Sequence, residues 1–424
     1  MKKSLAGLTG VAIGNSQMLK RESEQQEKRK ELPKRVLGRT GFKTSVVGSG
    51  KPVLEEVLRY ALESGVNYID SAEGYLGGRS DEIIGNAIKH FDRKKLFITS
   101  KLQLRDRDTK DRILTRTKRI LDKLKTDYVD CMMMHAVGRV ETLQHKGFHE
   151  AMVQLKQDGR VKHLGVSHHG TFNIDNPRDS MEKVLLNAIE DGRFDVFLFT
   201  YNFLNENRGE VVLEECGRKN IGTTIMKSNP ARKYFFFEDI VKGFTSGGKE
   251  VPAAYQTLLE KFKGKRKESL DFLKKYNVRN EDDINNAALK FTLDNKDVNT
   301  TCIYFGTFKD VDGHLSLPSL EMGLNERRML DDYKEAYGHL YCRHNCGVCE
   351  TSCRHNVPVN TIMRYNHYFF SQDRQKEAMT YYNELNTNKA DKCADCEGNC
   401  EKNCPYGIPV QGLLNIAHEN LTLA

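Results

Sequence analysis

The sequence predicts an α/β fold, a (β/α)8 TIM barrel followed by a small, mainly helical domain rich in cysteine. Strand-like and helix-like segments alternate about eight times from Arg35 to Gly313. The strand segments are short apolar runs, typical of parallel strands that are buried on both faces. Eight of the 11 cysteines lie between Cys342 and Cys404. We therefore predict an N-terminal segment at 1–34, a barrel at 35–335 and a cysteine-rich domain at 336–424.

The predicted strands are runs of β-branched, aromatic and other apolar residues, each followed by a helical pattern. A long insertion rich in Phe, Lys and Glu, at about 231–280, separates the seventh strand from its helix. The strands are predicted at 44–48, 67–70, 96–100, 128–134, 162–167, 196–200, 222–226 and 301–305.

The helices between the strands are predicted from apolar residues that recur at helical spacing. After the first strand Leu54, Leu58 and Leu62 share a face, and Gly65 ends the helix. The second helix is predicted to begin at Ser80, with two carboxylates in its first turn. The apolar faces of the next helices contain Ile83, Ile84, Ala87 and Ile88, then Ile113, Ile120 and Leu121, then Phe148, Met152 and Leu155.

Polar side chains follow three consecutive strands where each strand ends. Asp70 ends the second strand, Lys101 follows the third, His135 follows the fourth, and Tyr75 lies in the loop after Asp70. The carboxyl ends of barrel strands meet on one face, so these groups should lie close together. Taken alone, Asp70 and Tyr75 also fit a turn carboxylate with a packed ring, because loop carboxylates commonly cap turns.

Together the four side chains predict the reduction of a carbonyl. Asp70 would keep Lys101 charged, and the ammonium would lower the pKa of Tyr75 from its ordinary value of about 10. His135 would orient a carbonyl oxygen against the Tyr75 hydroxyl. Tyr75 would then be a general acid, with the hydride delivered by a nicotinamide.

Five stretches resemble the aldo/keto reductase superfamily over about 35–313. The Asp70, Tyr75, Lys101 and His135 positions match the family's catalytic tetrad in order. The resemblance thus implies catalytic roles for these four residues. The stretches are RVLGRTGFKTSVVGSG, YIDSAEGYLGGRSDEIIGNAI, FITSKL, YVDCMMMH and VQLKQDGRVKHLGVSHH.

The same resemblance implies NAD(P)H as the cofactor. Ser167 matches the family serine that holds the nicotinamide carboxamide, and His168 stands where an Asn usually follows. Leu198 has the place of a Gln that often completes this contact, and Gly306 that of the glycine before the adenosine-phosphate motif. We expect nicotinamide binding that is measurable but weaker than in typical relatives.

The C-terminal cysteines form two groups of four, and Pro405 follows the last of them. Four thiolates on one tight loop are typical of [4Fe-4S] binding, whereas zinc prefers two separated pairs. We predict two [4Fe-4S] clusters, with structural zinc as the alternative and disulfides disfavoured. The predicted ligands are Cys342, Cys346, Cys349, Cys353, Cys393, Cys396, Cys400 and Cys404.

This region resembles the two-cluster ferredoxin-like domain of one branch of the aldo/keto reductases. In two-cluster ferredoxins the fourth cysteine of each run ligates the other cluster. The resemblance implies one set in which Cys342, Cys346 and Cys349 combine with Cys404. The second set would be Cys393, Cys396, Cys400 and Cys353.

The leading functional hypothesis is a reductase that acts on a small carbonyl or alcohol and exchanges electrons with a redox partner protein. An alternative is an electron-transfer protein whose barrel only docks a substrate or partner. The net charge is +8, and no aromatics are interleaved with the basic runs, so we expect no nucleic-acid partner.

The chain is not expected to be integral to the membrane, because no apolar run approaches ~18 residues. As the sequence stands we expect a cytoplasmic protein. The alternative is export by the twin-arginine route, if 1–34 is a truncated signal rather than a disordered segment.

Overall fold

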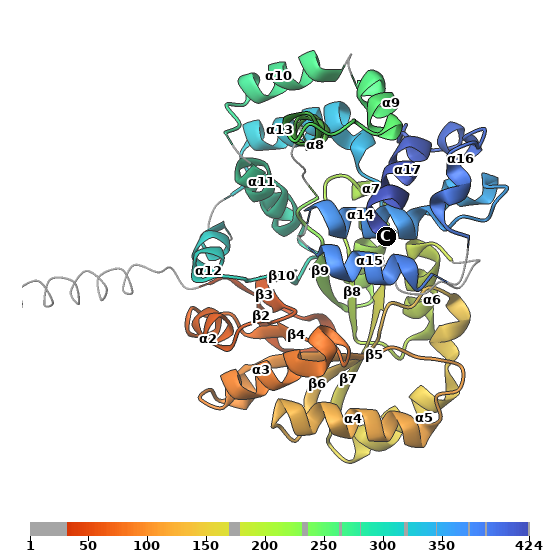
Figure 1. Ribbon diagram of the computed structural model, residues 1–424. Coiled ribbons are helices and arrows are strands. Elements are labelled where there is room, and N and C mark those ends of the chain that lie inside the picture. The colour runs from red at the N-terminus through yellow and green to blue at the C-terminus, as the bar shows by residue number, and fades with distance from the viewer. Residues whose placement is uncertain are drawn as a thin grey trace, which may run out of the picture.

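The computed structural model describes residues 32–168, 179–230, 236–262, 265–279, 281–317, 321–344, 346–371, 374–385 and 388–422. Eight parallel strands form a closed barrel in the order β10-β3-β4-β5-β6-β7-β8-β9 (Figure 1). The predicted barrel is confirmed. Its strands are β3 (Val47–Gly50), β4 (Tyr68–Asp70), β5 (Phe97–Leu102), β6 (Val129–Met134), β7 (Val161–His168), β8 (Val196–Thr200), β9 (Gly222–Met226) and β10 (Thr300–Ile303).

Helices surround the barrel and bury one apolar face each against the strands. In α2 the buried residues are Val57, Leu58, Ala61 and Leu62, whereas Leu54 precedes the helix and is exposed. The surrounding helices are α2 (Glu55–Glu63), α3 (Arg79–Ile88), α4 (Lys110–Leu124), α5 (Lys146–Gln157), α6 (Met181–Asp191), α7 (Glu206–Arg218), α11 (Glu281–Asp294), α12 (Phe308–Leu315) and α13 (Leu324–Tyr337).

The first predicted strand, 44–48, is wrong as a single element. Its first half is β2 (Lys43–Ser45), which pairs antiparallel with β1 (Lys34–Val36) outside the barrel. The chain bends at Val46 between β2 and β3, and the Asn67 side chain accepts a hydrogen bond from the adjacent Ser45 backbone N–H (2.6 Å). Leu32 is already buried in a core cluster, and the remainder of the predicted N-terminal segment, 1–31, lies outside the described residues.

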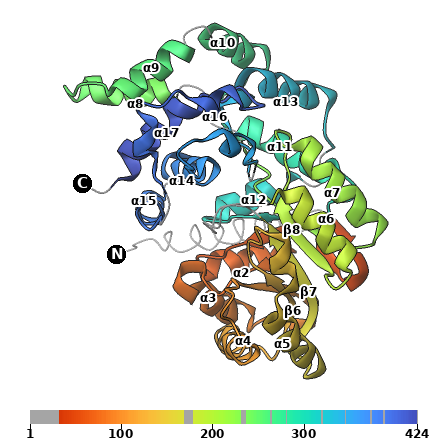
Figure 2. The same ribbon diagram turned by 90° about the vertical axis from the view of Figure 1, so that its right-hand side faces the viewer.

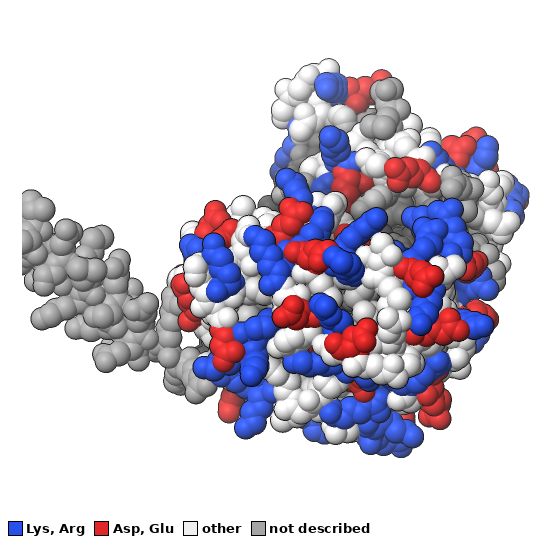
Figure 3. All heavy atoms as spheres, turned by 90° about the horizontal axis from the view of Figure 1, so that it is seen from below, with Lys and Arg blue, Asp and Glu red and all other residues white. Residues whose placement is uncertain are grey.

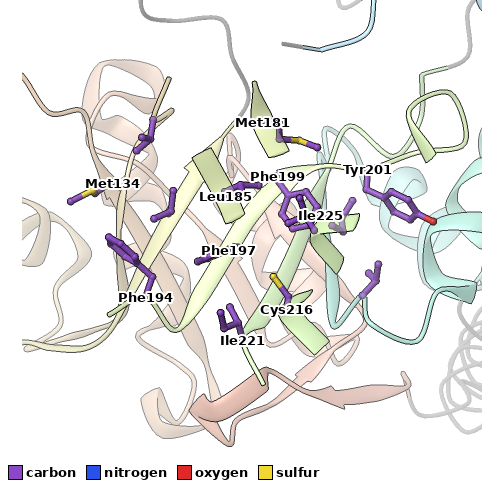
Figure 4. Close-up of a cluster of buried hydrophobic side chains, with 14 of the residues drawn as sticks. Met134, Met181, Leu185, Phe194, Phe197, Phe199, Tyr201, Cys216, Ile221 and Ile225 are labelled. Atoms are coloured by element: carbon purple, nitrogen blue, oxygen red, sulfur yellow. The ribbon is translucent and has the colours of Figure 1, made fainter. Parts of the chain in front are cut away.

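Alternation along the strands separates an inner core from an outer one. Leu198 on β8 packs inside the barrel, whereas Phe197 and Phe199 point outward to the helices. Figure 4 shows this outer cluster, where Phe197 and Phe199 lie beside Ile225 of β9. Strand parity therefore decides which side chains can reach the barrel interior.

The insertion after β9 folds as three helices, α8 (Phe236–Ser246), α9 (Ala253–Phe262) and α10 (Lys265–Lys275). Tyr255 and Leu258 of α9 are buried in the C-terminal core, and Asn420 donates a hydrogen bond to the Tyr255 hydroxyl (2.8 Å). Figures 1 and 2 show α8, α9 and the blue C-terminal helices on one side of the barrel. The C-terminal helices are α14 (Val359–Ser371), α15 (Gln375–Asn383), α16 (Asn399–Lys402) and α17 (Val410–Leu421).

Charge is distributed rather than concentrated on the face seen in Figure 3, where basic and acidic side chains alternate. At the end of the predicted basic run 261–275, Lys275 forms an ion pair with Asp332 (2.7 Å). Within the described ranges, no helix combines the length and apolar character needed to cross a membrane.

Candidate active site

Strand parity brings the predicted polar residues to one place. Tyr68 and Phe97 pack in the barrel interior, so Asp70 and Lys101, an even number of residues further along β4 and β5, also face inward. His135 directly follows β6, where Met133 faces inward. Strands β4, β5 and β6 are hydrogen-bonded neighbours, so the three side chains converge at the carboxyl mouth of the barrel.

Lys101 is the centre of this group and is fully buried. Its Nζ lies 2.7 Å from the Asp70 carboxylate and donates to the Ser71 carbonyl (2.6 Å) and to the Tyr75 hydroxyl (3.3 Å). Burial disfavours the charged amine, but Asp70 and Tyr75 outweigh that effect and raise the pKa of Lys101. Lys101 is therefore a fixed cation that donates a hydrogen bond to Tyr75.

The expected lowering of the Tyr75 pKa is wrong. Burial raises the pKa of Tyr75 to about 12, and this effect exceeds the opposing influence of the Lys101 ammonium. The Asp70 carboxylate adds to the increase, because its negative charge disfavours the phenolate form of Tyr75. Tyr75 is consequently protonated at neutral pH, as a proton donor must be.

His135 completes the group as a neutral imidazole. Its ring lies edge-on to the Tyr75 ring, with centroids 5.9 Å apart. Burial, followed by the nearby Lys101 charge, lowers the pKa of His135 to about 3. A neutral imidazole can donate a hydrogen bond to a carbonyl oxygen without competing for the proton of Tyr75.

The loop that presents Tyr75 lies between β4 and α3, and hydrogen bonds hold its two ends. At its start the Ser71 hydroxyl donates to the buried Asp81 carboxylate (2.5 Å), which lies in the first turn of α3. The helix begins at Arg79 instead of the predicted Ser80, and the Ser80 hydroxyl donates to a carbonyl elsewhere in the fold. Leu76, directly after Tyr75, adopts a positive φ of 54°, a conformation that L residues rarely adopt.

A cavity of about 600 Å³ opens from this tetrad. Its wall includes Tyr75 and His135 from the barrel but also Tyr368, Arg374 and Tyr381 from the C-terminal helices and the turn between them. The C-terminal domain thus contributes directly to the candidate active site. Sequence reasoning missed these residues, as it did Lys51, Lys227, Asp108 and Arg116, because none stands in the tetrad motif; it also missed Glu73, which lies within that motif between Asp70 and Tyr75.

The residues expected to hold the nicotinamide are buried on β7. The Ser167 hydroxyl accepts a hydrogen bond from the Ala136 backbone N–H (2.9 Å) and donates to the Met134 carbonyl (3.3 Å). It therefore ties β7 to the end of β6 and has no exposed surface, although its second lone pair is unused among the described residues. His168 is also fully buried, and Leu198 pairs with Ser167 across β7 and β8.

The loop after β10 is the expected adenosine-phosphate side. There the Asp310 carboxylate accepts hydrogen bonds from the Gly306 (3.0 Å) and Thr307 (2.8 Å) backbone N–H groups. These donors are the kind that bind phosphate at a helix N-terminus. Because the chain's own carboxylate uses them, this end of the site fits a phosphate poorly.

The structure gathers the first predicted cysteine set around one small cavity. Cys342, Cys346, Cys349 and Cys404 all line it. Burial raises the pKa of Cys342 to about 12, and the neighbouring Cys346 and Cys404 thiols add to the increase. The Asn360 side-chain amide donates a hydrogen bond to the Cys342 sulfur (3.2 Å).

The second set is also close in space. Burial raises the pKa of Cys393 to about 12, and the Cys400, Cys353 and Cys396 thiols act in the same direction. The Val357 backbone N–H donates to the Cys353 sulfur (3.4 Å). The first set expected from the resemblance, with Cys404 in place of Cys353, thus lines one cavity, and the assignment of the cysteines to two clusters stays a prediction.

No group of three or more His, Cys, Asp or Glu side chains in the described ranges is arranged to hold a single metal ion. All eleven cysteines, each of them in a described range, are free of disulfide bonds.

Comparison with known proteins identifies the family to which the chain belongs. The model of the Aldo/keto reductase family matches residues 36–315. The uncharacterized oxidoreductase YqkF of Bacillus subtilis is 33% identical over 152 residues, which are 32% of this chain and 49% of that protein. L-galactose dehydrogenase of Arabidopsis thaliana is 22% identical over 303 residues, 66% of this chain and 86% of that protein.

Among solved structures, the holo form of an aldo-keto reductase from Bacillus halodurans superposes with a TM-score of 0.52 at 17% identity. The superposition covers 74% of this chain and 100% of that one, and it shows a shared fold. The chain spans about half the length of the first curated relatives it matches.

Proposed function

Because the chain belongs to the aldo/keto reductase family, we propose that it is an oxidoreductase that interconverts a small carbonyl and the corresponding alcohol, with a nicotinamide as hydride carrier. The observation that carries this proposal is the contact of a buried Lys101–Asp70 ion pair with the Tyr75 hydroxyl beside a neutral His135. A bound nicotinamide supplies the hydride.

The residues of the chain position the carbonyl and supply the proton. The His135 ring donates a hydrogen bond to the carbonyl oxygen, and the Tyr75 hydroxyl donates its proton to the same oxygen as the alcohol forms. The hydrogen bond from Lys101 stabilises the phenolate that remains, and Asp70 keeps Lys101 charged. Solvent then returns a proton to Tyr75.

Replacement of Tyr75 by Phe tests this role. Loss of the only proposed proton donor should reduce carbonyl turnover by about 10²–10⁴-fold, with NADPH affinity nearly unchanged. Tyr276→Phe is the matched control, because the Tyr276 hydroxyl contacts Asp332 and does not line the cavity. Parental turnover in the Tyr75 variant would remove Tyr75 from the chemistry.

Nicotinamide binding needs a direct measurement, because the two ends of its expected site differ in the hydrogen-bonding groups that they leave for a cofactor. Ser167 keeps an unused acceptor lone pair, whereas Asp310 uses the phosphate-binding donors after β10. We expect NADPH or NADH to bind, but weakly, in a fluorescence titration. If neither bound at millimolar concentration, the alternative of a docking body without nicotinamide chemistry would be favoured.

The C-terminal domain is proposed to hold two [4Fe-4S] clusters that exchange electrons with a redox partner protein. One cluster would be held by the thiols around the small cavity and the other by the second set. The N–H donors to the Cys342 and Cys353 sulfurs support this role, because hydrogen bonds to sulfur tune cluster potentials. Bound clusters would supply one-electron transfer.

Metal analysis of protein made without oxygen decides between clusters and zinc. We expect brown protein with about eight irons and eight acid-labile sulfides per chain, and interacting clusters after reduction. Stoichiometric zinc without sulfide would leave a reductase with a structural C-terminal domain.

A further inference from the structure

Two lysines lie at the barrel mouth beside the tetrad, and the reduction chemistry described above uses neither. Lys51 directly follows β3, and Lys227 directly follows β9. Both line the cavity that contains Tyr75 and His135. In the closed barrel only β10 separates their two strands, so the lysines occupy one side of the mouth.

The backbone holds both lysines in an unusual conformation. Lys51 has a φ of 48° and Lys227 a φ of 58°, in the left-handed region that L residues rarely adopt. Hydrogen bonds fix each position: the Lys51 N–H donates to the Asp70 carbonyl (3.1 Å), and the Lys227 carbonyl accepts from the Asn202 side chain (2.8 Å). Such conformations concentrate at ligand sites, where the surrounding structure maintains them.

Neither lysine has a carboxylate partner in the described part of the chain. The Lys227 Nζ is buried, and among the described residues it has no hydrogen-bond partner. The Lys51 Nζ lies 5.8 Å from the centroid of the Tyr75 ring, and both residues line the same cavity. A buried amine without a partner is costly to hold as a cation, and a bound anion would relieve that cost.

The wall formed by the C-terminal helices carries a cation and a carboxylate that are paired with each other. Arg374 belongs to this wall, and its guanidinium is paired with Glu377 (2.7 Å and 2.5 Å). Glu377 also accepts a hydrogen bond from the Tyr381 hydroxyl (2.7 Å). Burial lowers the pKa of both lysines. Repulsion from Arg374 adds to the decrease for Lys51, where the Glu377 carboxylate opposes it, and repulsion from Arg364 and Arg374 adds to the decrease for Lys227. The site therefore has an excess of positive charge within reach of Tyr75.

We propose that Lys51 and Lys227 form an anion subsite, so that the substrate is a carbonyl compound bearing a carboxylate or phosphate a few bonds from the reacting carbon. The inference rests on the proposed reductase function and specifies its substrate class. The anionic group would supply the missing partner of both lysines through charge-assisted hydrogen bonds. It would also fix the carbonyl against Tyr75, because Lys51 contacts the same region of the cavity.

Matched pairs of carbonyl substrates test the proposal in the full-length protein. The pairs are 4-oxobutanoate against butanal, and glyceraldehyde 3-phosphate against glyceraldehyde. We expect kcat/KM to favour at least one anionic member by 10-fold or more. Lys51→Met and Lys227→Met should each reduce kcat/KM for the anionic member by about 10- to 100-fold, the loss typical of one hydrogen bond to a charged group, and should change kcat/KM for the neutral member much less. Lys156→Met, which removes an exposed lysine on α5, is the matched control.

Binding of a molecule that cannot be reduced separates this proposal from the reductase function. Calorimetry should detect succinate, with weaker or no binding of uncharged succinamide, and both lysine variants should weaken the succinate signal. If no carbonyl were reduced but succinate bound in this way, the reductase function would fail and the anion subsite would stand.

Two results would overturn the proposal. One is equal turnover of the charged and neutral members of both pairs together with no succinate binding. The other is a large increase in the NADPH dissociation constant in the lysine variants with the substrate preference unchanged, because the lysines would then bind the cofactor phosphates.

Discussion

Replacement of Lys101 by Met should destabilise the barrel severely, and the size of the effect follows from its burial. Lys101 has no exposed surface, and Asp70 is only 3% exposed. Met approximates the length of the lysine stem but leaves the Asp70 carboxylate without the ammonium 2.7 Å away. An uncompensated buried charge of this kind costs about 3–5 kcal/mol in the free energy of unfolding.

The double variant Lys101→Met with Asp70→Asn separates this charge effect from lost packing. Removal of both charges avoids the uncompensated carboxylate, so the double variant should recover at least about 2 kcal/mol relative to Lys101→Met alone. Urea unfolding followed by circular dichroism is the suitable assay, because the chain contains no Trp for fluorescence. If the single and double variants were equally unstable, the ion pair would not be the source of the effect.

The effect of pH on the stability that the Lys101–Asp70 ion pair contributes has a definite sign. Asp70 and Tyr75 raise the pKa of Lys101 in the folded state. The contribution of the pair is therefore fully present below the ordinary lysine pKa of about 10.4, and it is lost as pH rises through the higher folded value. In the parent the contribution of this pair should therefore stay constant from about pH 6 to pH 9, as measured by urea unfolding.

The remaining predictions concern His135 and the cysteine domain. Since burial lowers the pKa of His135 to about 3, its contribution to stability is present above the ordinary value of about 6.5 and is lost as pH falls. His135→Gln should therefore make the free energy of unfolding fall less steeply between about pH 6.5 and pH 4. His90→Gln, at an exposed histidine, should not change this slope. Equal slopes in the parent and the His135 variant would contradict the assignment. Cys349→Ser should lower the iron content and the unfolding temperature of the C-terminal domain, because small metal-bound domains draw folding energy from the ligand. Cys216→Ser, in the barrel core, should leave the iron content unchanged, and an equal loss of iron in both variants would argue against Cys349 as a ligand.

The barrel and its tetrad could be predicted because both depend on local patterns. Strand segments were recognisable from short apolar runs, and parallel strands place their carboxyl ends on one face. Asp70, Lys101 and His135 each stand at such an end, so their convergence follows from topology alone. The first strand was misplaced because no Gly, Pro, Asn or Asp stands between Ser45 and Val47 to mark the bend at Val46 that divides β2 from β3.

Only the tertiary structure decided two properties of the site: the sign of the Tyr75 pKa shift and the set of residues that line the cavity. Both depend on contacts between segments that are distant in sequence. The sign of the Tyr75 pKa shift depends on burial, which exceeds the effect of the Lys101 charge only once the loop is packed against the barrel. Arg374 reaches the cavity from the C-terminal domain, and Lys227 lies on the far side of the mouth from Asp70, so no motif connects them to the tetrad. A sequence shows which side chains stand at the end of a strand. The burial and the net charge of a cavity depend on every residue that lines it, and these residues come from distant parts of the chain.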